Sequence, residues 1–255
     1  MLLHRNLVKK TERHAIELAL TKPNQRWNMA KKKKSSFLGK IWSLFWRLLL
    51  LMVFILLLFR FIPLPTSAFM LQSPYPVTQK WFNIDKLPSA MSLAVVASED
   101  QRFPLHYGVD FTEIINALEQ YDDGNGLRGA STITQQTAKN IFLWSDRSFV
   151  RKGLEAGLAI GLETLWGKKR ILEVYLNIAE FGKGIYGVEA ASQHYYGKSA
   201  SQISIHQAAK LAVLLPSPRT RDPHHLTPNL AQRVTWIERQ MRQLGANYLT
   251  PILEK

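Results

Sequence analysis

A long apolar segment constrains the fold of this chain more than any other feature. Residues 41–62 read IWSLFWRLLLLMVFILLLFRFI, with 12 uninterrupted apolar residues between Arg47 and Arg60. Twelve helical residues rise only about 18 Å, whereas all 22 rise about 33 Å and can cross a hydrocarbon layer of about 30 Å. The segment predicts a single transmembrane helix over residues 41–62, with both arginines reaching towards the headgroups. A cleaved signal peptide is the alternative, which the short apolar core favours, but PTSA at 65–68 is a poor Ala-x-Ala cleavage site.

The positive charge of the chain is concentrated before the end of this segment. The 255 residues carry a formal net charge of +14, from 33 Lys and Arg against 19 Asp and Glu. Residues 1–60 hold 13 basic and 2 acidic residues, a net of +11, and the other 195 hold 20 and 17, a net of +3. By the positive-inside rule, residues 1–40 form a basic cytoplasmic tail, and the chain after the helix lies outside. A lysine run can also bind nucleic acid, but here it is expected to set topology, and no nucleic-acid partner is predicted.

The basic tail also contains a second candidate start. Met29 begins MAKKKKSSF, which resembles a natural N-terminus, and residues 1–28 show no targeting pattern. Translation from Met29 instead of Met1 is therefore a hypothesis. Recovery of a peptide from residues 1–28 by mass spectrometry of the native protein would contradict it.

Two regions follow the apolar segment. Residues 63–88 hold five of the chain's 12 prolines and predict an extended connector outside the core. In residues 89–255 apolar residues recur every three or four positions, without alternating runs, and predict a mainly α-helical domain. The chain has no cysteine, which excludes disulfides, thiolate zinc sites and cysteine nucleophiles.

The segment SEDQRFPLHYG at 98–108 is the first candidate for chemistry. Glu99 and Asp100 close an apolar helical run, and a carboxylate at the edge of an apolar wall can acquire the raised pKa of a general base. A solvated helix end is an equally good interpretation of these two residues alone.

A second candidate, RGASTITQQTAKN at 128–140, predicts a loop and an N-cap at Ser131 followed by a helix. Thr132, Gln136 and Asn140 fall on one face of that helix, with Lys139 alongside. Such a helix start suits an oligosaccharide or a phosphate, although the solvent face of an amphipathic helix would look similar.

A third candidate, DRSFVRKGLE at 146–155, repeats Arg147, Arg151 and Glu155 every four residues, with Lys152 beside them. Such a ladder is usually surface decoration worth a few tenths of a kcal/mol. Between Arg128 and Arg170, however, eight basic residues meet three acidic ones, and this local excess suggests an anionic ligand.

Taken together, these segments resemble the peptidoglycan glycosyltransferases of glycosyltransferase family 51. The resemblance runs in order and spacing from about Leu93 to Pro218, and TAKNIFLWSDRSFVRKGLEAGL and YLNIAEFG look most like the monofunctional branch of Gram-negative bacteria. No Ser-x-x-Lys or Lys-Thr-Gly of a transpeptidase domain is found in the sequence. The resemblance implies a mainly α fold in which one N-terminal transmembrane helix precedes a lysozyme-like glycosyltransferase domain, residues 89–255, with head and jaw subdomains.

The family's activity is the polymerisation of lipid II by inverting transfer from an undecaprenyl-pyrophosphate-linked donor to the 4-hydroxyl of GlcNAc. By resemblance, Glu99 is the base on that hydroxyl, and Glu155 is the second carboxylate, which orients the cations or the sugar. The donor pyrophosphate is assigned to Lys139, Arg147 and Arg151, with Lys152 adjoining. Positions expected to shape the cleft are Asp100, Phe103, His106, Ser131, Thr132, Gln136 and Asn140.

The resemblance also implies partners and a location. The partners are lipid II, the growing glycan strand, the membrane, and proteins of cell-wall synthesis and division. No metal site or cofactor is required, although Mg or Mn assisting the pyrophosphate stays open. The location is the bacterial inner membrane, with the N-terminus cytoplasmic and the catalytic domain periplasmic, and moenomycin is the expected inhibitor. The alternatives are a membrane-anchored lytic transglycosylase or lysozyme-like muramidase, and an inactive tethered interaction protein.

Two further segments are interpreted as structural. In KKRILEVYLNIAEFGKGIYG, the residues Ile171, Leu172, Val174, Tyr175 and Ile178 predict a buried stripe. Glu173 and Glu180 could be mistaken for a catalytic pair, but a structural role is favoured. Gln207 stands where many relatives carry Glu, and its position is also interpreted as structural.

Overall fold

The computed structural model describes residues 37–122, 131–146 and 148–254. The predicted basic tail before residue 37, the second start at Met29 and the candidate residue Arg147 lie outside the described residues. The chain divides into two compact units, residues 1–50 and residues 51–255.

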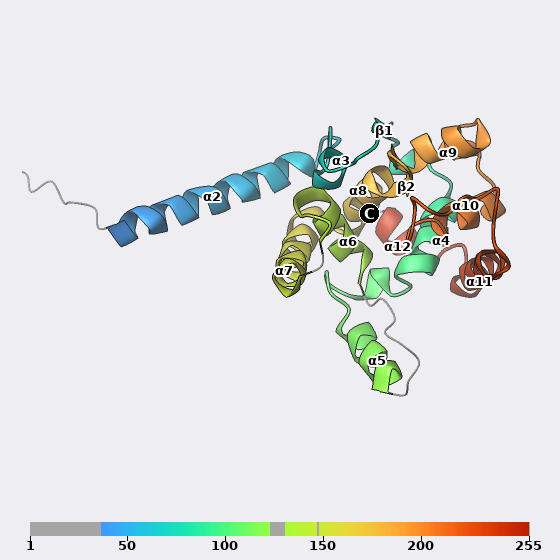
Figure 1. Cartoon of the computed structure of the whole chain (residues 1–255). Coiled ribbons are helices and arrows are strands. Elements are labelled where there is room, and N and C mark those ends of the chain that lie inside the picture. Colours follow the sequence, from blue (N-terminus) through green and yellow to red (C-terminus); the bar gives the residue numbers. More distant parts are fainter. Residues whose placement is uncertain (1–36, 123–130, 147, 255) are drawn as a thin grey trace, which may run out of the picture. The chain divides into compact units, whose positions relative to one another are not determined.

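The apolar segment forms helix α2, Phe37–Phe59 (Figure 1). Its best 18-residue window has a mean hydropathy of 2.4, and among the described residues it is the one helix long and apolar enough to cross a membrane. The helix begins four residues before the predicted span of 41–62 and ends three residues before its end. The early end has a local cause, because Pro63 disfavours helical geometry in the residue before it.

The end of α2 lies within the larger unit and is hydrogen-bonded there. Nη2 of Arg170 donates to the carbonyl of Phe59 at 2.8 Å, and this carbonyl, at the helix C-terminus, has no intrahelical donor. Arg60 donates to the carbonyl of Leu165 at 2.6 Å. The guanidinium of Arg60, expected to reach towards headgroups, thus binds a backbone carbonyl of the protein itself.

Residues 63–88 differ from the predicted connector. They form α3 (Ala68–Leu71), β1 (Thr78–Gln79) and the short 3-10 helix η1 (Ile84–Lys86). Leu64, Met70 and Ile84 are buried in the core of the larger unit, so the prediction that this segment stays outside the core is wrong. The prolines separate very short elements without preventing the apolar residues between them from packing.

The prediction of a mainly α-helical fold is confirmed. Figure 1 shows α8 near the middle of the larger unit, and contacts join it to α6, α7, α9 and α12. A second group packs α4 against α10 and α11. The helices after α3 are α4 (Ser89–Glu99), η2 (Phe103–Leu105), α5 (Phe111–Asp122), α6 (Ile133–Phe142), α7 (Phe149–Trp166), α8 (Lys168–Ile178), α9 (Val188–Tyr196), η3 (Ala200–Gln202), α10 (Ile205–Ala212), α11 (Pro228–Leu244) and α12 (Thr250–Leu253).

A small sheet, which the periodicity did not predict, joins the connector to the segment after α8. Its order is β1-β3-β2, with β2 at Glu180–Gly182 and β3 at Ile185–Tyr186; β1 is parallel and β2 antiparallel to β3. The turn between β2 and β3 requires Gly184, whose φ is +74° and whose added Cβ would lie 2.2 Å from the carbonyl oxygen of Pro76.

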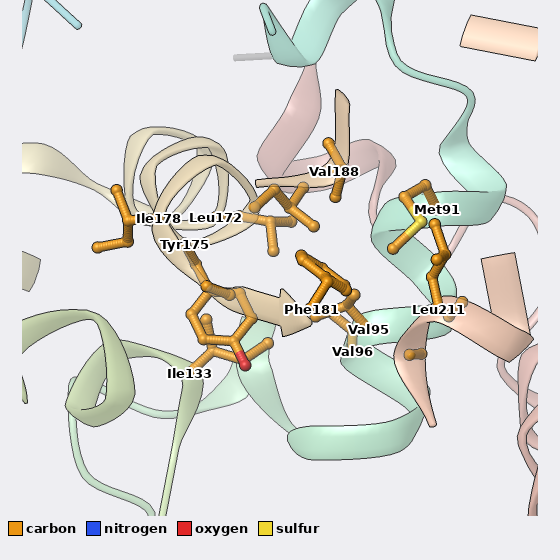
Figure 2. Packing of buried hydrophobic residues seen from close by; sticks show 14 of the residues in the cluster. Met91, Val95, Val96, Ile133, Leu172, Tyr175, Ile178, Phe181, Val188 and Leu211 are labelled. Atoms are coloured by element: carbon orange, nitrogen blue, oxygen red, sulfur yellow. The ribbon is translucent and has the colours of Figure 1, made fainter. Parts of the chain in front are cut away.

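The core lies where α4, α8 and α10 meet the sheet. Figure 2 shows Val95 and Val96 of α4, Leu172 and Tyr175 of α8, and Phe181 of β2 facing one another. The predicted stripe of α8 is buried throughout, at Ile171, Leu172, Val174, Tyr175 and Ile178. At the C-terminal end of α4, Glu99 is hydrogen-bonded to Gln136 of α6.

Candidate active site

Glu99 is the last residue of α4 and follows the buried run of residues 91–97 after one half-buried residue, Ser98. Its carboxylate accepts hydrogen bonds from Nε2 of Gln136 at 3.1 Å and from the hydroxyl of Ser98 at 3.2 Å. Burial raises the pKa of Glu99 above its usual value, although both hydrogen bonds and two nearby arginines act in the opposite direction. The interpretation as a solvated helix end does not fit this environment, whereas a carboxylate with a raised pKa suits a general base.

Gln136 connects Glu99 to the core. While its Nε2 donates to Glu99, its Oε1 accepts a hydrogen bond from the hydroxyl of Tyr175 at 3.0 Å. Burial raises the pKa of Tyr175 well above its usual value, with the nearby carboxylates adding to the shift, so the phenol keeps its proton and can donate. The amide of Gln136 is thus held at both ends.

The helix that carries Gln136 begins differently from the sequence prediction. Thr132, not Ser131, is the N-cap of α6: its side chain accepts from the N–H of Gln135, whose side chain accepts in return from the N–H of Thr132. This reciprocal capping box satisfies two donors at the helix start. Ser131 instead accepts a hydrogen bond from Nζ of Lys152 at 2.7 Å.

Arg151, Lys152 and Glu155 form a compact charged cluster on α7. Oε2 of Glu155 accepts from Arg151 at 3.1 Å and Oε1 accepts from Lys152 at 2.7 Å. Glu155 is only 2% exposed and Arg151 is 9% exposed, so the interpretation as surface decoration is wrong. A buried carboxylate that engages one cation with each oxygen fixes the position of both cations.

Lys139, on α6, is a partly buried cation of the site. Within the part of the chain that the structure describes, its Nζ forms no ion pair and lies 5.2 Å from the centre of the Phe69 ring. Its pKa is lowered, first by burial and then by Arg151 and Lys152, while Glu155 acts in the opposite direction. A partly buried cation without a carboxylate partner is costly unless an anion binds there.

Two cavities lie at the site, and Gln136, which hydrogen-bonds Glu99, lines the second of them. The Glu99 cavity has a volume of about 330 Å³ and is lined by residues that include Glu99, Asp100, Asp110, Ser131, Thr132, Trp236 and Gln240. The Lys139 cavity has a volume of about 410 Å³ and is lined by residues that include Gln136, Lys139, Asn140, Tyr175, Glu180 and Arg219. Of the predicted cleft residues, Asp100, Ser131 and Thr132 line the first cavity, and Gln136 and Asn140 line the second.

Phe103 and His106 line neither of these cavities. Asp100 accepts hydrogen bonds from Nε2 of His106 at 3.0 Å and from the backbone N–H of Ile133 at 2.9 Å, which ties the loop after α4 to the start of α6. Phe103 is fully buried, and Nζ of Lys168 lies 4.3 Å from the centre of its ring. Both side chains are therefore buried supports of the site, and neither lines the two cavities.

Several residues at the cavities were not identified as site residues from the sequence. Tyr175 was placed in the buried stripe, and only its polar tip distinguishes it from the rest of that stripe. Glu180 was interpreted as structural; it binds Arg219 through both oxygens at 3.0 Å, yet it also lines the Lys139 cavity. Trp236 and Gln240 lie on α11, beyond the motifs, and no sequence signal marked them.

A metal site is not evident in the geometry. Across residues 37–122, 131–146 and 148–254, no group of three or more His, Asp or Glu side chains is placed to hold a metal ion. The proposed assistance by Mg or Mn stays a prediction.

The packed helices bring a carboxylate with a raised pKa and a cluster of cations to two cavities, an arrangement suited to group-transfer catalysis. A family model described as "Transglycosylase" matches residues 67–242, and the chain belongs to that family. It is therefore an enzyme, a glycosyltransferase.

Curated proteins similar to this chain carry a narrower description than the family model does. The chain is 74% identical over 226 residues to the biosynthetic peptidoglycan transglycosylase of Marinomonas sp. (strain MWYL1), covering 89% of this chain and 100% of that protein. It is 67% identical over 221 residues to the protein of that name from Shewanella frigidimarina (strain NCIMB 400), covering 87% and 98%. The corresponding protein of Shewanella denitrificans (strain OS217) is 72% identical over 187 residues, covering 73% and 82%. These similarities confirm the resemblance to peptidoglycan glycosyltransferases that the motifs indicated.

Proposed function

We propose that this transglycosylase polymerises lipid II into peptidoglycan glycan strands. Lipid II is a disaccharide-pentapeptide on undecaprenyl pyrophosphate. In the proposed step, the GlcNAc 4-hydroxyl of one lipid II attacks the anomeric carbon of the growing strand and forms a β-1,4 bond. The bond from that carbon to pyrophosphate breaks, and undecaprenyl pyrophosphate departs with the bonding electron pair.

The observation that carries this proposal is that Glu99 and Lys139 line two separate cavities of one site. Glu99 lines one cavity and Lys139 lines the other, and Gln136, which lines the Lys139 cavity, donates a hydrogen bond to Glu99. An inverting displacement needs a base on the attacking hydroxyl and positive charge at the departing pyrophosphate, and each cavity supplies one of the two requirements. The Glu99 cavity is accordingly assigned to the acceptor and the Lys139 cavity to the donor.

Each charged residue then has a role. Glu99 removes the proton of the 4-hydroxyl, and its raised pKa makes it a stronger base than an ordinary carboxylate. Lys139 contacts the donor pyrophosphate, which supplies an anionic partner that it does not have among the described residues. Arg147, Arg151 and Lys152 extend the positive charge, and Glu155 holds Arg151 and Lys152 in place.

The function is tested with two single-use substrates. A labelled lipid II lacking the GlcNAc 4-hydroxyl can act only as donor, and a lipid II with a methylene phosphonate in place of the anomeric oxygen can act only as acceptor. Together in detergent they should give one coupled tetrasaccharide. Glu99→Gln should abolish coupling and retain the fold, and full activity of that variant would refute its role as base.

The donor assignment is tested in the same assay. Lys139→Ala should raise the KM for the donor at least tenfold and leave the KM for the acceptor nearly unchanged. Lys86→Ala, at an exposed lysine that lines neither cavity, is the matched control. Equal losses for donor and acceptor would contradict the assignment, and release of sugars from preformed strands without coupling would identify a hydrolase instead. Assays after chelation with EDTA, with and without added Mg²⁺, measure any contribution of a divalent cation.

The proposed location is the bacterial inner membrane. Helix α2 would anchor the chain with its N-terminus in the cytoplasm and the catalytic unit in the periplasm, within reach of cell-wall synthesis and division proteins. Added protease should then digest the catalytic unit in spheroplasts but not in intact cells. Protection in spheroplasts would refute this orientation.

A further inference from the structure

Helix α11 brings two side chains to the cavity that contains Glu99. Trp236 and Gln240 are one helical turn apart and line this cavity. Contacts join α11 to α4, which carries Glu99, and to α10 (Figure 1). Val234, Ile237 and Met241 of the same helix are buried, so the core holds α11 firmly while the 236/240 edge faces the cavity.

The indole of Trp236 is held in a defined position beside Glu99. The guanidinium carbon of Arg233 lies 3.7 Å from the centre of the Trp236 ring. Nη2 of Arg233 also donates to the carbonyl of Ser98 at 3.3 Å, and Ser98 immediately precedes Glu99. Arg233 thus links the orientation of the aromatic ring to the backbone that carries the proposed base.

The side-chain amide of Gln240 lines the cavity and can form hydrogen bonds to a ligand. Among residues 37–122, 131–146 and 148–254, its side chain makes no hydrogen bond, although it lines a cavity whose other walls carry carboxylates and hydroxyls. An amide offers two N–H donors and one carbonyl acceptor, which matches the hydroxyl and acetamido groups of an amino sugar. A cavity of about 330 Å³ has the size of a small-ligand site, and its mostly polar lining around one aromatic ring suits a hydroxylated ligand.

We propose that Trp236 and Gln240 bind the acceptor sugar, with the indole packing against the pyranose ring and the amide hydrogen-bonding its substituents, so that the 4-hydroxyl is presented to Glu99. The inference rests on the proposed function, because it assigns the acceptor to the Glu99 cavity. It adds a specificity-determining surface from a helix that lies beyond the motifs of the chain.

The test uses the full chain with the donor-only and acceptor-only lipid II analogues. Gln240→Ala and Trp236→Leu should each raise the KM for the acceptor about tenfold, with the KM for the donor changed less than twofold. Trp236→Phe should retain most acceptor affinity, because it keeps an aromatic face. Gln243→Ala, an exposed residue of the same helix, should behave as the wild type.

The possible outcomes separate this inference from the function it rests on. If the wild type couples the two analogues but Gln240→Ala and Trp236→Leu leave the acceptor KM unchanged, or raise the KM values for donor and acceptor equally, the acceptor role is wrong. If the wild type makes no coupled product, the proposed function itself fails. A melting temperature for Gln240→Ala equal to that of the wild type would ensure that its acceptor defect is not a folding defect.

Discussion

The ion pair between Glu163 and Lys168 should contribute measurably to the free energy of unfolding. Oε1 of Glu163 accepts three hydrogen bonds: from Nζ of Lys168 at 2.6 Å, the hydroxyl of Thr134 at 2.7 Å and the N–H of Gly108 at 3.1 Å. The two charged side chains are only 3% and 13% exposed. The pair therefore joins α6, α7, α8 and the loop after α4 at a site that water hardly reaches.

Lys168→Met removes the cation and leaves the Glu163 carboxylate buried with two neutral donors. Breaking a buried pair by removing one partner costs about 3–5 kcal/mol, a large share of the roughly 5–15 kcal/mol that stabilises a typical domain. The double variant Glu163→Gln/Lys168→Met removes both charges and keeps an acceptor for Thr134 and Gly108. We expect the free energy of unfolding of this double variant to lie within about 2 kcal/mol of the wild-type value.

Glu163→Gln alone should lower the free energy of unfolding by less than Lys168→Met does, and the size of its effect should depend on pH. The pKa of Lys168 is lowered by burial from its usual value of 10.5, and Glu163 opposes that shift. Without Glu163 the pKa of Lys168 falls further, so between that lowered pKa and 10.5 the unfolded state binds more protons than the folded state. The stability of Glu163→Gln should therefore rise as the pH rises towards 10.

Urea unfolding in detergent, followed by tryptophan fluorescence at pH 7, measures these differences. Lys169→Met is the matched control, because Lys169 pairs with Asp85 at a site where the two side chains are 33% and 63% exposed, and loss of such a pair costs about 1 kcal/mol or less. A Lys168→Met variant no less stable than Lys169→Met would refute the reasoning. So would a double variant whose cost equals the sum of the two single costs.

Three further predictions follow from individual residues. Burial raises the pKa of Glu99 above 4.5, so the contribution of this carboxyl to folding stability is present below pH 4.5 and is lost as the pH rises through the folded-state pKa. The melting temperature of Glu99→Gln, relative to that of the wild type, should therefore be higher at pH 8 than at pH 5. A difference that stays constant with pH would contradict this prediction. Because burial lowers the pKa of Lys139 below 10.5, donor affinity should weaken at a lower pH than for an ordinary lysine, and Lys139→Arg should remove that alkaline loss in a titration of donor KM. Gly184→Ala should destabilise by more than 2 kcal/mol through its positive φ and the close carbonyl of Pro76, whereas Gly157→Ala, in open space on α7, should stabilise by about 0.5–1 kcal/mol; thermal unfolding compares the two directly.

The sequence was most informative where chemistry and helical periodicity coincide. The order of the motifs indicated the family, and the four-residue spacing of Arg151 and Glu155 predicted a contact that the structure contains. The spacing could not reveal that this contact is buried, because periodicity describes one helix and not what packs against it. For the same reason, periodicity could not predict that Phe103 is fully buried and does not line the site.

Other features depended on long-range packing or on segments too short for a pattern. Strands of two or three residues show no alternation, and the proline-rich segment enters the core through single apolar residues such as Met70. Thr132 and Ser131 are both good N-caps, and the choice between them follows from the hydroxyl of Thr132, which also donates to the carbonyl of Gly108 at 2.5 Å. Trp236 lines the same cavity as Glu99 although 137 positions of sequence separate them, which no local rule could predict.

The bridge from Tyr175 through Gln136 to Glu99 has a consequence for the catalytic cycle. A carboxylate needs a donor, whereas a carboxylic acid needs an acceptor; an amide offers one of each at its two ends, and a phenol can serve as either. If Gln136 rotates its amide by 180° when Glu99 takes up a proton, its oxygen meets the acid and its NH₂ meets the hydroxyl of Tyr175. A base that gains and loses a proton in every transfer would then keep a matched partner in both states, without the roughly 1–3 kcal/mol that an unsatisfied buried group costs.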